Sequence, residues 1–112
     1  MDELIGQLEA LGYTVDQSFR SQGFVVIRDF VINAGRDAGR TVDIGILGRD
    51  FPFTPPAGIH IRPILDPPAE RGDQGSPLGN EWCYWSRRIP EWDKNRSAHN
   101  IISYINKVFL NA

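Results

Sequence analysis

Cys83 is the residue of this sequence with the clearest capacity for covalent chemistry. It is the only cysteine among 112 residues, so an intrachain disulfide is impossible and no cysteine cluster can hold zinc. A thiolate is a strong nucleophile, and the nearby cations Arg87 and Arg88 favour it, although acidic neighbours offset them. Cysteine is also among the residues most often buried, and Cys83 stands within the aromatic segment WCYW. The residues alone therefore leave two alternatives, a reactive thiol and a packed core thiol.

The two histidines are the side chains best matched to proton transfer near neutral pH. His99 stands near the start of the last expected helix and off its apolar face, where it is either a proton-transfer group or a solvated residue. His60 lies in a segment that alternates apolar and polar residues, which favours an outward, structural histidine. The two histidines lack metal-ligand spacing and the glycines form no phosphate-binding motif, so we expect no metal and no cofactor.

Short elements of both kinds must position these residues. Apolar residues recur at helical spacing over residues 2–11 and predict an amphipathic helix. Residues 24–32 and 41–47 are rich in β-branched side chains and predict two antiparallel strands, joined by the turn-forming sequence NAGRDAGR. Residues 59–62 alternate between flanking prolines and predict a third strand. The fold class is therefore α+β, with an N-terminal helix and an antiparallel β-meander.

The second half of the chain combines a long loop with a final helix. Residues 65–80 are dense in Pro, Gly, Asp and Ser, so we expect an irregular, exposed loop of the length that is usually functional or mobile. Apolar residues then return at helical spacing over residues 101–109, with Ser97 or Asn95 as the expected N-cap. No repeat or linker divides the chain, so residues 1–112 are expected to form a single domain.

Charge and hydrophobicity exclude several classes of partner. The net charge is -2 and the pI is near 5.6, which gives no basic footprint for nucleic acid or an anionic membrane. The sequence has no apolar run long enough to cross a bilayer, and acidic residues occupy the start where a signal peptide would carry basic ones. We therefore expect a cytoplasmic protein that binds neither nucleic acid nor membranes.

Residues 50–63, DFPFTPPAGIHIRP, resemble the ubiquitin-conjugating (E2) family, in which a meander strand leads to a YPF-x-PP segment and a further strand. Phe51 replaces the usual Tyr, and four residues match in place: Pro52, Phe53, Pro55 and Pro56. In that family the nucleophilic Cys follows a long loop, with a Trp about eight residues later and then a helix. Cys83 and Trp92 stand in that order here. The compact form is similar to bacterial E2-like proteins encoded beside E1-like, ubiquitin-like and JAB-type peptidase genes.

The resemblance implies that Cys83 accepts the C-terminus of a ubiquitin-like protein from an E1-like enzyme as a thioester. It further implies that His99 orients or deprotonates the incoming nucleophile and that Asn80 donates its amide to the oxyanion, although Asn80 is also an ordinary turn residue. The pathway would be a bacterial conjugation system, of the kind used in antiphage defence, with a JAB-type peptidase among its members.

The resemblance also indicates a partner-binding surface, although the residues themselves favour the tryptophans as anchors of the core and the loop. Its expected residues are Phe51, Phe53, Arg87, Arg88 and Trp92. The His-Pro-Asn motif that typical members place before the nucleophile is absent before Cys83. This absence and the aromatic setting of Cys83 favour an alternative, a catalytically inactive E2-like binding module that holds a ubiquitin-like protein or an E1-like partner.

Overall fold

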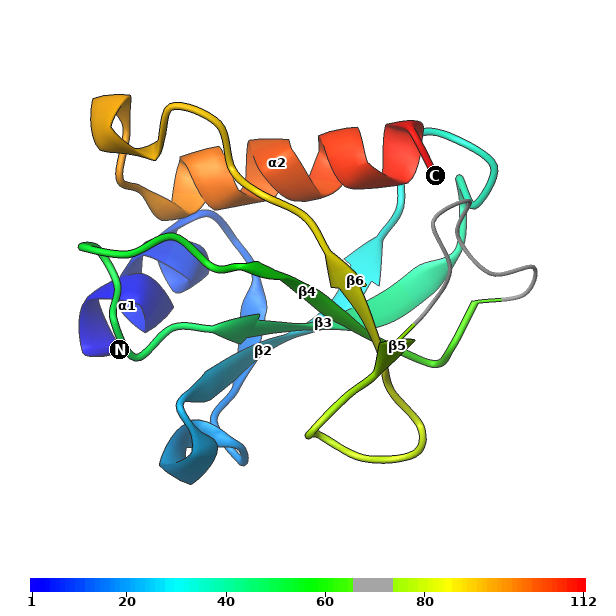
Figure 1. Ribbon diagram of the computed structural model, residues 1–112, viewed down its shortest axis with the longest axis horizontal. Helices are drawn as coiled ribbons and strands as arrows, with labels where there is room; N and C mark the ends of the chain where they lie inside the picture. The colour runs from blue at the N-terminus through cyan, green and yellow to red at the C-terminus, as the bar shows by residue number, and fades with distance from the viewer. Residues whose placement is uncertain (66–73) are drawn as a thin grey trace.

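The computed structural model describes residues 1–65 and 74–112, with the backbone only at Gln74 (Figure 1). In chain order the elements are α1 (Asp2–Ala10), β1 (Thr14–Asp16), the 3-10 helix η1 (Arg20–Gln22), β2 (Phe24–Val31), β3 (Thr41–Leu47), β4 (Gly58–Arg62), β5 (Gln74–Gly75), β6 (Cys83–Ser86), the 3-10 helix η2 (Trp92–Lys94) and α2 (Ala98–Leu110). The α+β class, both helices and the three expected strands are confirmed. Ser97 is the N-cap of α2, and its hydroxyl accepts a hydrogen bond from the Asn100 N–H.

A six-stranded antiparallel sheet, in the order β1-β2-β3-β4-β6-β5, forms the centre of the fold. The first four strands are a meander. The sequence predicts its strands β2, β3 and β4, and β1 is an additional strand. β6 then pairs with β4, placing Cys83 opposite Ile61 and Trp85 opposite Ile59. The short β5 closes this edge of the sheet by pairing with β6.

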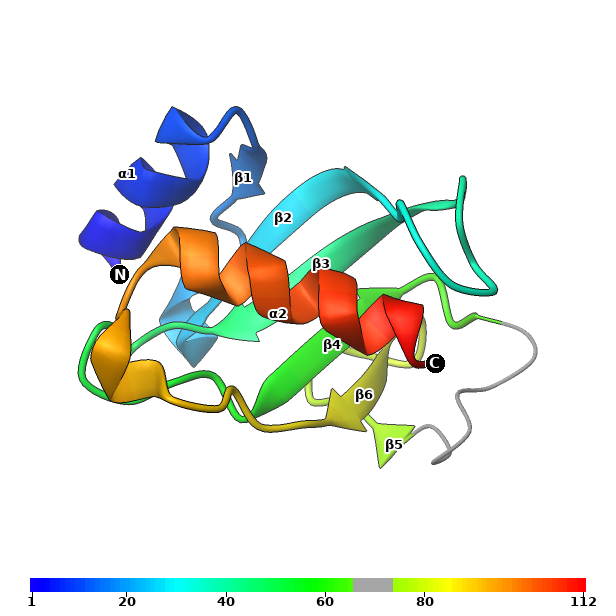
Figure 2. The ribbon, with the colours of Figure 1, turned by 90° about the horizontal axis from the view of Figure 1, so that it is seen from above.

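Both helices bury their apolar sides against one face of the sheet. Figure 2 shows α2 crossing this face, with α1 beside the first turns of α2 near β1. A hydrogen bond joins the two helices, since Ala98 N–H donates to Gln7 Oε1 at 2.8 Å. At the other end of α2, Trp85 packs edge-on against Phe109 with ring centroids 5.5 Å apart. No helix within residues 1–65 and 74–112 has the length and apolarity to cross a membrane.

The opposite face of the sheet, here called the outer face, is covered in part by residues 76–82. Residues 24–27 of β2 are apolar without alternation and all four are buried, so β2 needs cover on both sides. Leu78 and Trp82 supply that cover, and with Phe24 and Val26 they form a second apolar cluster. The cover lies close because Gly45 of β3 carries no side chain, and a Cβ atom there would meet Leu78.

Charged side chains continue the outer face across four strands. Asp43 of β3 accepts hydrogen bonds from Arg28 of β2 at 3.2 Å and from Arg62 of β4 at 2.9 Å. Arg28 also reaches Asp16 of β1 at 3.3 Å. The Arg62 guanidinium lies 4.5 Å from the centroid of the Trp82 ring. This row of charges therefore connects the meander to the segment that covers it.

Three features of the second half differ from the sequence predictions. The aromatic segment at residues 83–86 is a strand, and β5 adds a short strand inside the expected loop. The loop is also not exposed throughout, because Leu65 and Leu78 are buried. Burial of these leucines stabilises a segment whose composition alone predicts solvent exposure. Residues 66–73 of that prediction lie outside the described residues.

Replacement of Gly58 tests the close approach of β4 and β6. A Cβ atom at Gly58 would meet the Trp85 carbonyl oxygen and the Ser86 Cα atom, so Gly58→Ala must displace backbone. We expect a loss of about 1–3 kcal/mol in the free energy of unfolding, measured by urea denaturation. The matched control is Gly6→Ala on the exposed side of α1, where a Cβ meets nothing within 4 Å. That change should stabilise the chain by about 0.5–1 kcal/mol. Equal effects at both positions would contradict the tight β4–β6 packing.

Candidate functional site

Cys83 lies in the core between the sheet and α2. Side chains alternate along β6, so Cys83 and Trp85 point to the helix-covered face while Tyr84 points to the outer face. Cys83 is only 2% exposed and belongs to the main apolar cluster. A nucleophile that receives a protein's C-terminus must be reachable from solvent. In the described arrangement Cys83 therefore has the placement of a structural thiol.

Asn80 is exposed in the turn that precedes β6, beside a small hollow in the surface. The hollow has a volume of about 340 Å³ and is lined by Ile64, Gly75, Ser76, Gly79, Asn80, Trp82 and Cys83. Cys83 and Asn80 thus border the same hollow, as the sequence-based hypothesis requires. The two residues come together here although the thiol side chain is covered.

His99 lies far from Cys83. It is exposed in the first turn of α2, and Phe109 follows about three turns later, roughly 15 Å along the helix axis. Trp85 contacts Phe109, and Figure 2 shows β6 beneath the C-terminal half of α2. The imidazole is therefore at the wrong end of the helix to exchange a proton with a group bound at Cys83. The structure corrects the sequence-based grouping of His99 with Cys83 and Asn80.

His60 is on the outer face, as its alternating segment predicts, but it is buried rather than exposed. Phe24 packs edge-on to its ring at 4.9 Å and Tyr84 stacks on it at 4.7 Å. Its Nδ1 atom lies 2.8 Å from Ser76 Oγ, which joins β4 to the covering segment. Burial disfavours the imidazolium and lowers the pKa of His60 to about 4. His60 is therefore a neutral structural residue at pH 7.

The expected partner-binding aromatics divide into two groups. Phe51 and Trp92 are buried against each other with ring centroids 6.0 Å apart, and Trp92 Nε1 donates to the Pro52 carbonyl oxygen at 2.9 Å. They anchor the β3–β4 connection to η2 and are not available to a partner. Phe53 in the same connection is 76% exposed. Of the three expected aromatics, only Phe53 presents its ring to solvent.

Arg87 and Arg88 lie directly after β6, beside the C-terminal half of α2. They line a surface pocket together with Tyr104 and Lys107 of α2. Neither Tyr104 nor Lys107 was identified from sequence, because both fall within the periodic pattern of an amphipathic helix. The available signal was the hydroxyl of Tyr104, a polar group on the side of the helix that the pattern assigns to the core.

Comparisons with known proteins return no match: no family model, no curated protein and no solved structure matches this chain. Within the residues described, no group of three or more His, Cys, Asp or Glu side chains is arranged to hold a metal ion.

The burial of Cys83 predicts slow modification of the native protein. With a chromogenic disulfide reagent, we expect the thiol of the folded chain to react on the order of 100-fold more slowly than the same thiol in denaturing urea, because reaction requires opening of the core. A Cys83→Ala chain provides the blank. Rapid, stoichiometric labelling under native conditions would show that β6 opens readily.

The buried neutral His60 predicts a loss of stability in acid. Its pKa is about 4 in the folded chain and near 6.5 when unfolded, so the unfolded state binds the proton more tightly. The full contribution is present above about pH 6.5 and is lost as the pH falls toward 4. We expect about 2 kcal/mol of additional destabilisation over this range, measured by urea denaturation.

Two variants isolate this effect. His60→Phe keeps an aromatic ring between Phe24 and Tyr84 but removes the titrating group, so its stability should vary less with pH. His99→Gln removes the exposed histidine and should retain the pH dependence of the unmodified chain. An unchanged pH profile in His60→Phe would assign the acid sensitivity to other groups.

Proposed function

We propose that this chain is an E2-like binding module that holds a ubiquitin-like protein or an E1-like partner and does not carry a thioester on Cys83. The observation that carries the proposal is the burial of Cys83, which is 2% exposed and faces α2. A thioester there would require room for a peptide tail inside a packed core, where added volume is destabilising.

The order of elements supports the E2-like part of the proposal. An N-terminal helix is followed by a four-stranded meander, in which the Pro-rich crossing joins β3 to β4, and then by a helix that covers the sheet. This is the order that the resemblance at residues 50–63 implies. Pro52, Pro55 and Pro56 stiffen this crossing. The absence of His-Pro-Asn before Cys83 fits a member that binds without catalysing transfer.

Phe53 is the best candidate for the centre of the partner surface. Large aromatic side chains that are exposed on a rigid support are typical anchors of protein interfaces. The connection that carries Phe53 is held by the packing of Phe51 on Trp92 and by the hydrogen bond from Trp92 to Pro52. Phe51 and Trp92, the buried residues of the expected partner surface, therefore hold the exposed Phe53 in position.

A second candidate function is the thioester-carrying transferase, in a bacterial conjugation pathway of the kind used in antiphage defence. It is favoured by the hollow that Cys83 and Asn80 both line. In this case the segment 75–82 would move away from the sheet during the reaction and bring the thiol to the surface. Asn80 would then stand three residues before the acylated sulfur, as an amide donor to the oxyanion.

A binding and charging experiment separates the two functions. The chain is mixed with a cognate E1-like enzyme, the ubiquitin-like protein and ATP, and the products are separated on a non-reducing gel. Under our proposal no thiol-sensitive adduct forms, although the E1-like enzyme itself becomes charged. Calorimetry should nonetheless detect binding of one of the two proteins, and Phe53→Ala should weaken it by about tenfold or more.

Matched controls decide the outcome. Val31→Ala removes another exposed apolar side chain, one that is 50% exposed on β2, and should leave the affinity unchanged. Cys83→Ala should also bind normally. An adduct that forms with the unmodified chain and disappears both with a thiol and in Cys83→Ala would establish the transferase and overturn the binding-module proposal.

A further inference from the structure

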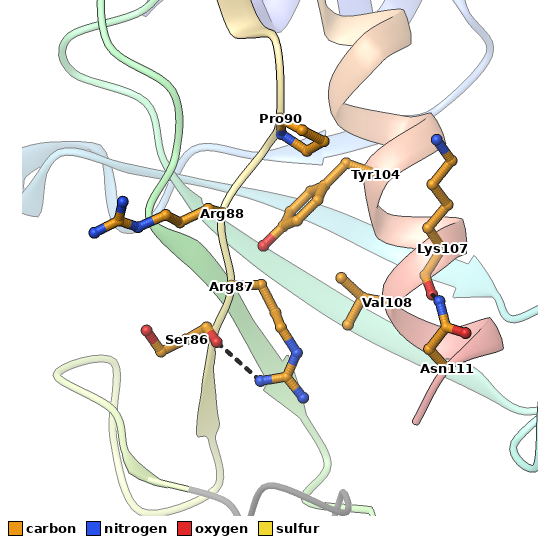
Figure 3. A pocket seen from close by; sticks show the side chains of 8 residues that line it. All are labelled: Ser86, Arg87, Arg88, Pro90, Tyr104, Lys107, Val108 and Asn111. Carbon is orange, nitrogen blue, oxygen red and sulfur yellow. Dashed lines mark hydrogen bonds between the residues drawn. The ribbon is translucent and has the colours of Figure 1, made fainter.

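A pocket of about 700 Å³ lies between the segment that follows β6 and the C-terminal half of α2 (Figure 3). Its walls are formed by Ser86, Arg87, Arg88, Pro90, Tyr104, Lys107, Val108 and Asn111. It is separate from the hollow beside Asn80, since the two share no lining residue. Polar and apolar side chains contribute to it together, which is the composition expected of a ligand site.

The pocket concentrates positive charge. Among the residues that the structure describes, its lining contains three cations, Arg87, Arg88 and Lys107, and no acidic residue. Among the described residues none of the three forms an ion pair, whereas several other arginines of the chain do. Arg87 has one hydrogen bond, from Nη1 to the Ser86 carbonyl oxygen at 2.8 Å. Three cations on a chain of net charge -2 make this an attractive position for an anionic group.

Tyr104 provides a second, independent indication of a ligand. Its side chain is 6% exposed, and its hydroxyl has no hydrogen-bond partner among the described residues. A buried polar group without a partner costs about 1–3 kcal/mol, so it usually marks a missing partner. In Figure 3 the hydroxyl points from α2 toward the strand-following segment that carries Arg87 and Arg88. Burial raises the pKa of Tyr104 far above neutral, so the hydroxyl is a hydrogen-bond donor at pH 7.

We infer that this pocket binds the carboxylate of an Asp or Glu side chain in an extended segment of a partner protein. Each of the Arg87 and Arg88 guanidinium groups is a planar donor that matches a carboxylate, and Lys107 adds a third charge. Figure 3 shows these three charged groups pointing in different directions, so their flexible side chains have to turn toward the bound carboxylate. The Tyr104 hydroxyl donates to the bound carboxylate once a ligand displaces the side chains that cover it. The ligand thus supplies the partner that this hydroxyl lacks.

The shape of the surface favours an internal segment of a chain over a small ion. Two further hollows adjoin the pocket: one shares Pro90, Tyr104 and Lys107 with it, and the other shares Ser86 and Arg88. The hollowed surface therefore extends beyond the pocket, which leaves room for a bound segment longer than one residue. Within residues 1–65 and 74–112, the one acidic residue that lines these hollows is Glu91, which is paired with Lys94 at 3.1 Å.

A single negative charge also suits the pocket better than a phosphate dianion. The pocket lies at the C-terminal end of α2, where helix carbonyl groups carry partial negative charge. Phosphate sites commonly use helix N-termini or Gly-rich loops, and neither contributes to this lining. The inference stands without the E2-like proposal, because it uses only the residues of the pocket.

The test is an NMR titration of the full chain labelled with nitrogen-15. The probe is the peptide N-acetyl-Gly-Ala-Glu-Ala-Gly carboxamide, and its control is the same peptide with Gln in place of Glu. We expect the Glu peptide to shift the backbone amide signals of residues 86–90 and 104–111 in a saturable way. The Gln peptide should bind at least about fivefold more weakly, because it lacks the charge.

Variants identify the groups that hold the carboxylate. Arg88→Ala and Lys107→Ala should each weaken binding of the Glu peptide about threefold or more. The matched control, Arg49→Ala, removes an exposed cation outside the pocket and should leave the affinity unchanged. Tyr104→Phe should weaken peptide binding while raising the urea midpoint of the free chain, because it removes an unpartnered buried hydroxyl. A merely structural tyrosine would not produce this opposite pair of effects.

Three results would overturn the inference. The first is the absence of saturable shifts at residues 86–90 and 104–111. The second is equal affinity for the Glu and Gln peptides. The third is a higher affinity for inorganic phosphate or for N-acetyl-triglycine with a free terminal carboxylate, which would reassign the pocket to a phosphate group or to a chain end.

Discussion

The central sheet must bury both of its faces, although helices cover only one of them. This constraint arises in β2, where residues 24–27 are apolar without alternation. Two of these side chains face α1 and α2, and the other two need a second cover. The chain provides it by passing residues 76–82 over the outer face, where Leu78 and Trp82 pack above Gly45. The path of the loop, the start of β6 and the surroundings of Cys83 all depend on this cover.

The same constraint explains why reactive groups and exposed groups are separated in this fold. Once Trp82 is fixed on the outer face, β6 begins at the next residue and its first side chain enters the helix-covered core. The thiol is thereby removed from solvent, while Arg87 and Arg88 emerge after the strand ends, beside α2. The groups placed for recognition are consequently the cations of the pocket, the Tyr104 hydroxyl once it is uncovered, and the exposed ring of Phe53. This set is suited to recognition more than to acyl transfer.

The strands with the strongest β-branched patterns, 24–31 and 41–47, could be predicted from sequence, as could α2 with its cap at Ser97. β6 could not, because a single apolar run of Trp, Cys and Tyr gives no alternation that distinguishes a strand from a packed loop.

For the site, the sequence identified Cys83 and Asn80 as neighbours but not the burial of the thiol, which depends on the register between β6 and β4. The sequence-based prediction also grouped His99 with Cys83 and Asn80. The number of residues between two positions does not reveal that α2 runs back across the sheet and carries His99 away from Cys83. Tyr104 was missed because periodicity counts its ring and ignores its hydroxyl.

The ends of the sheet limit how this protein can associate with others. β1 has three residues and β5 has two, and these strands form the two edges of the sheet. An incoming strand gains affinity from a row of backbone hydrogen bonds, and edges this short offer only a few of them. Recognition by strand addition, and the edge-to-edge aggregation that uses the same chemistry, are both disfavoured. A protein that binds this chain would instead recognise side chains projecting from loops and from α2, and such a surface can change by substitution without altering the sheet.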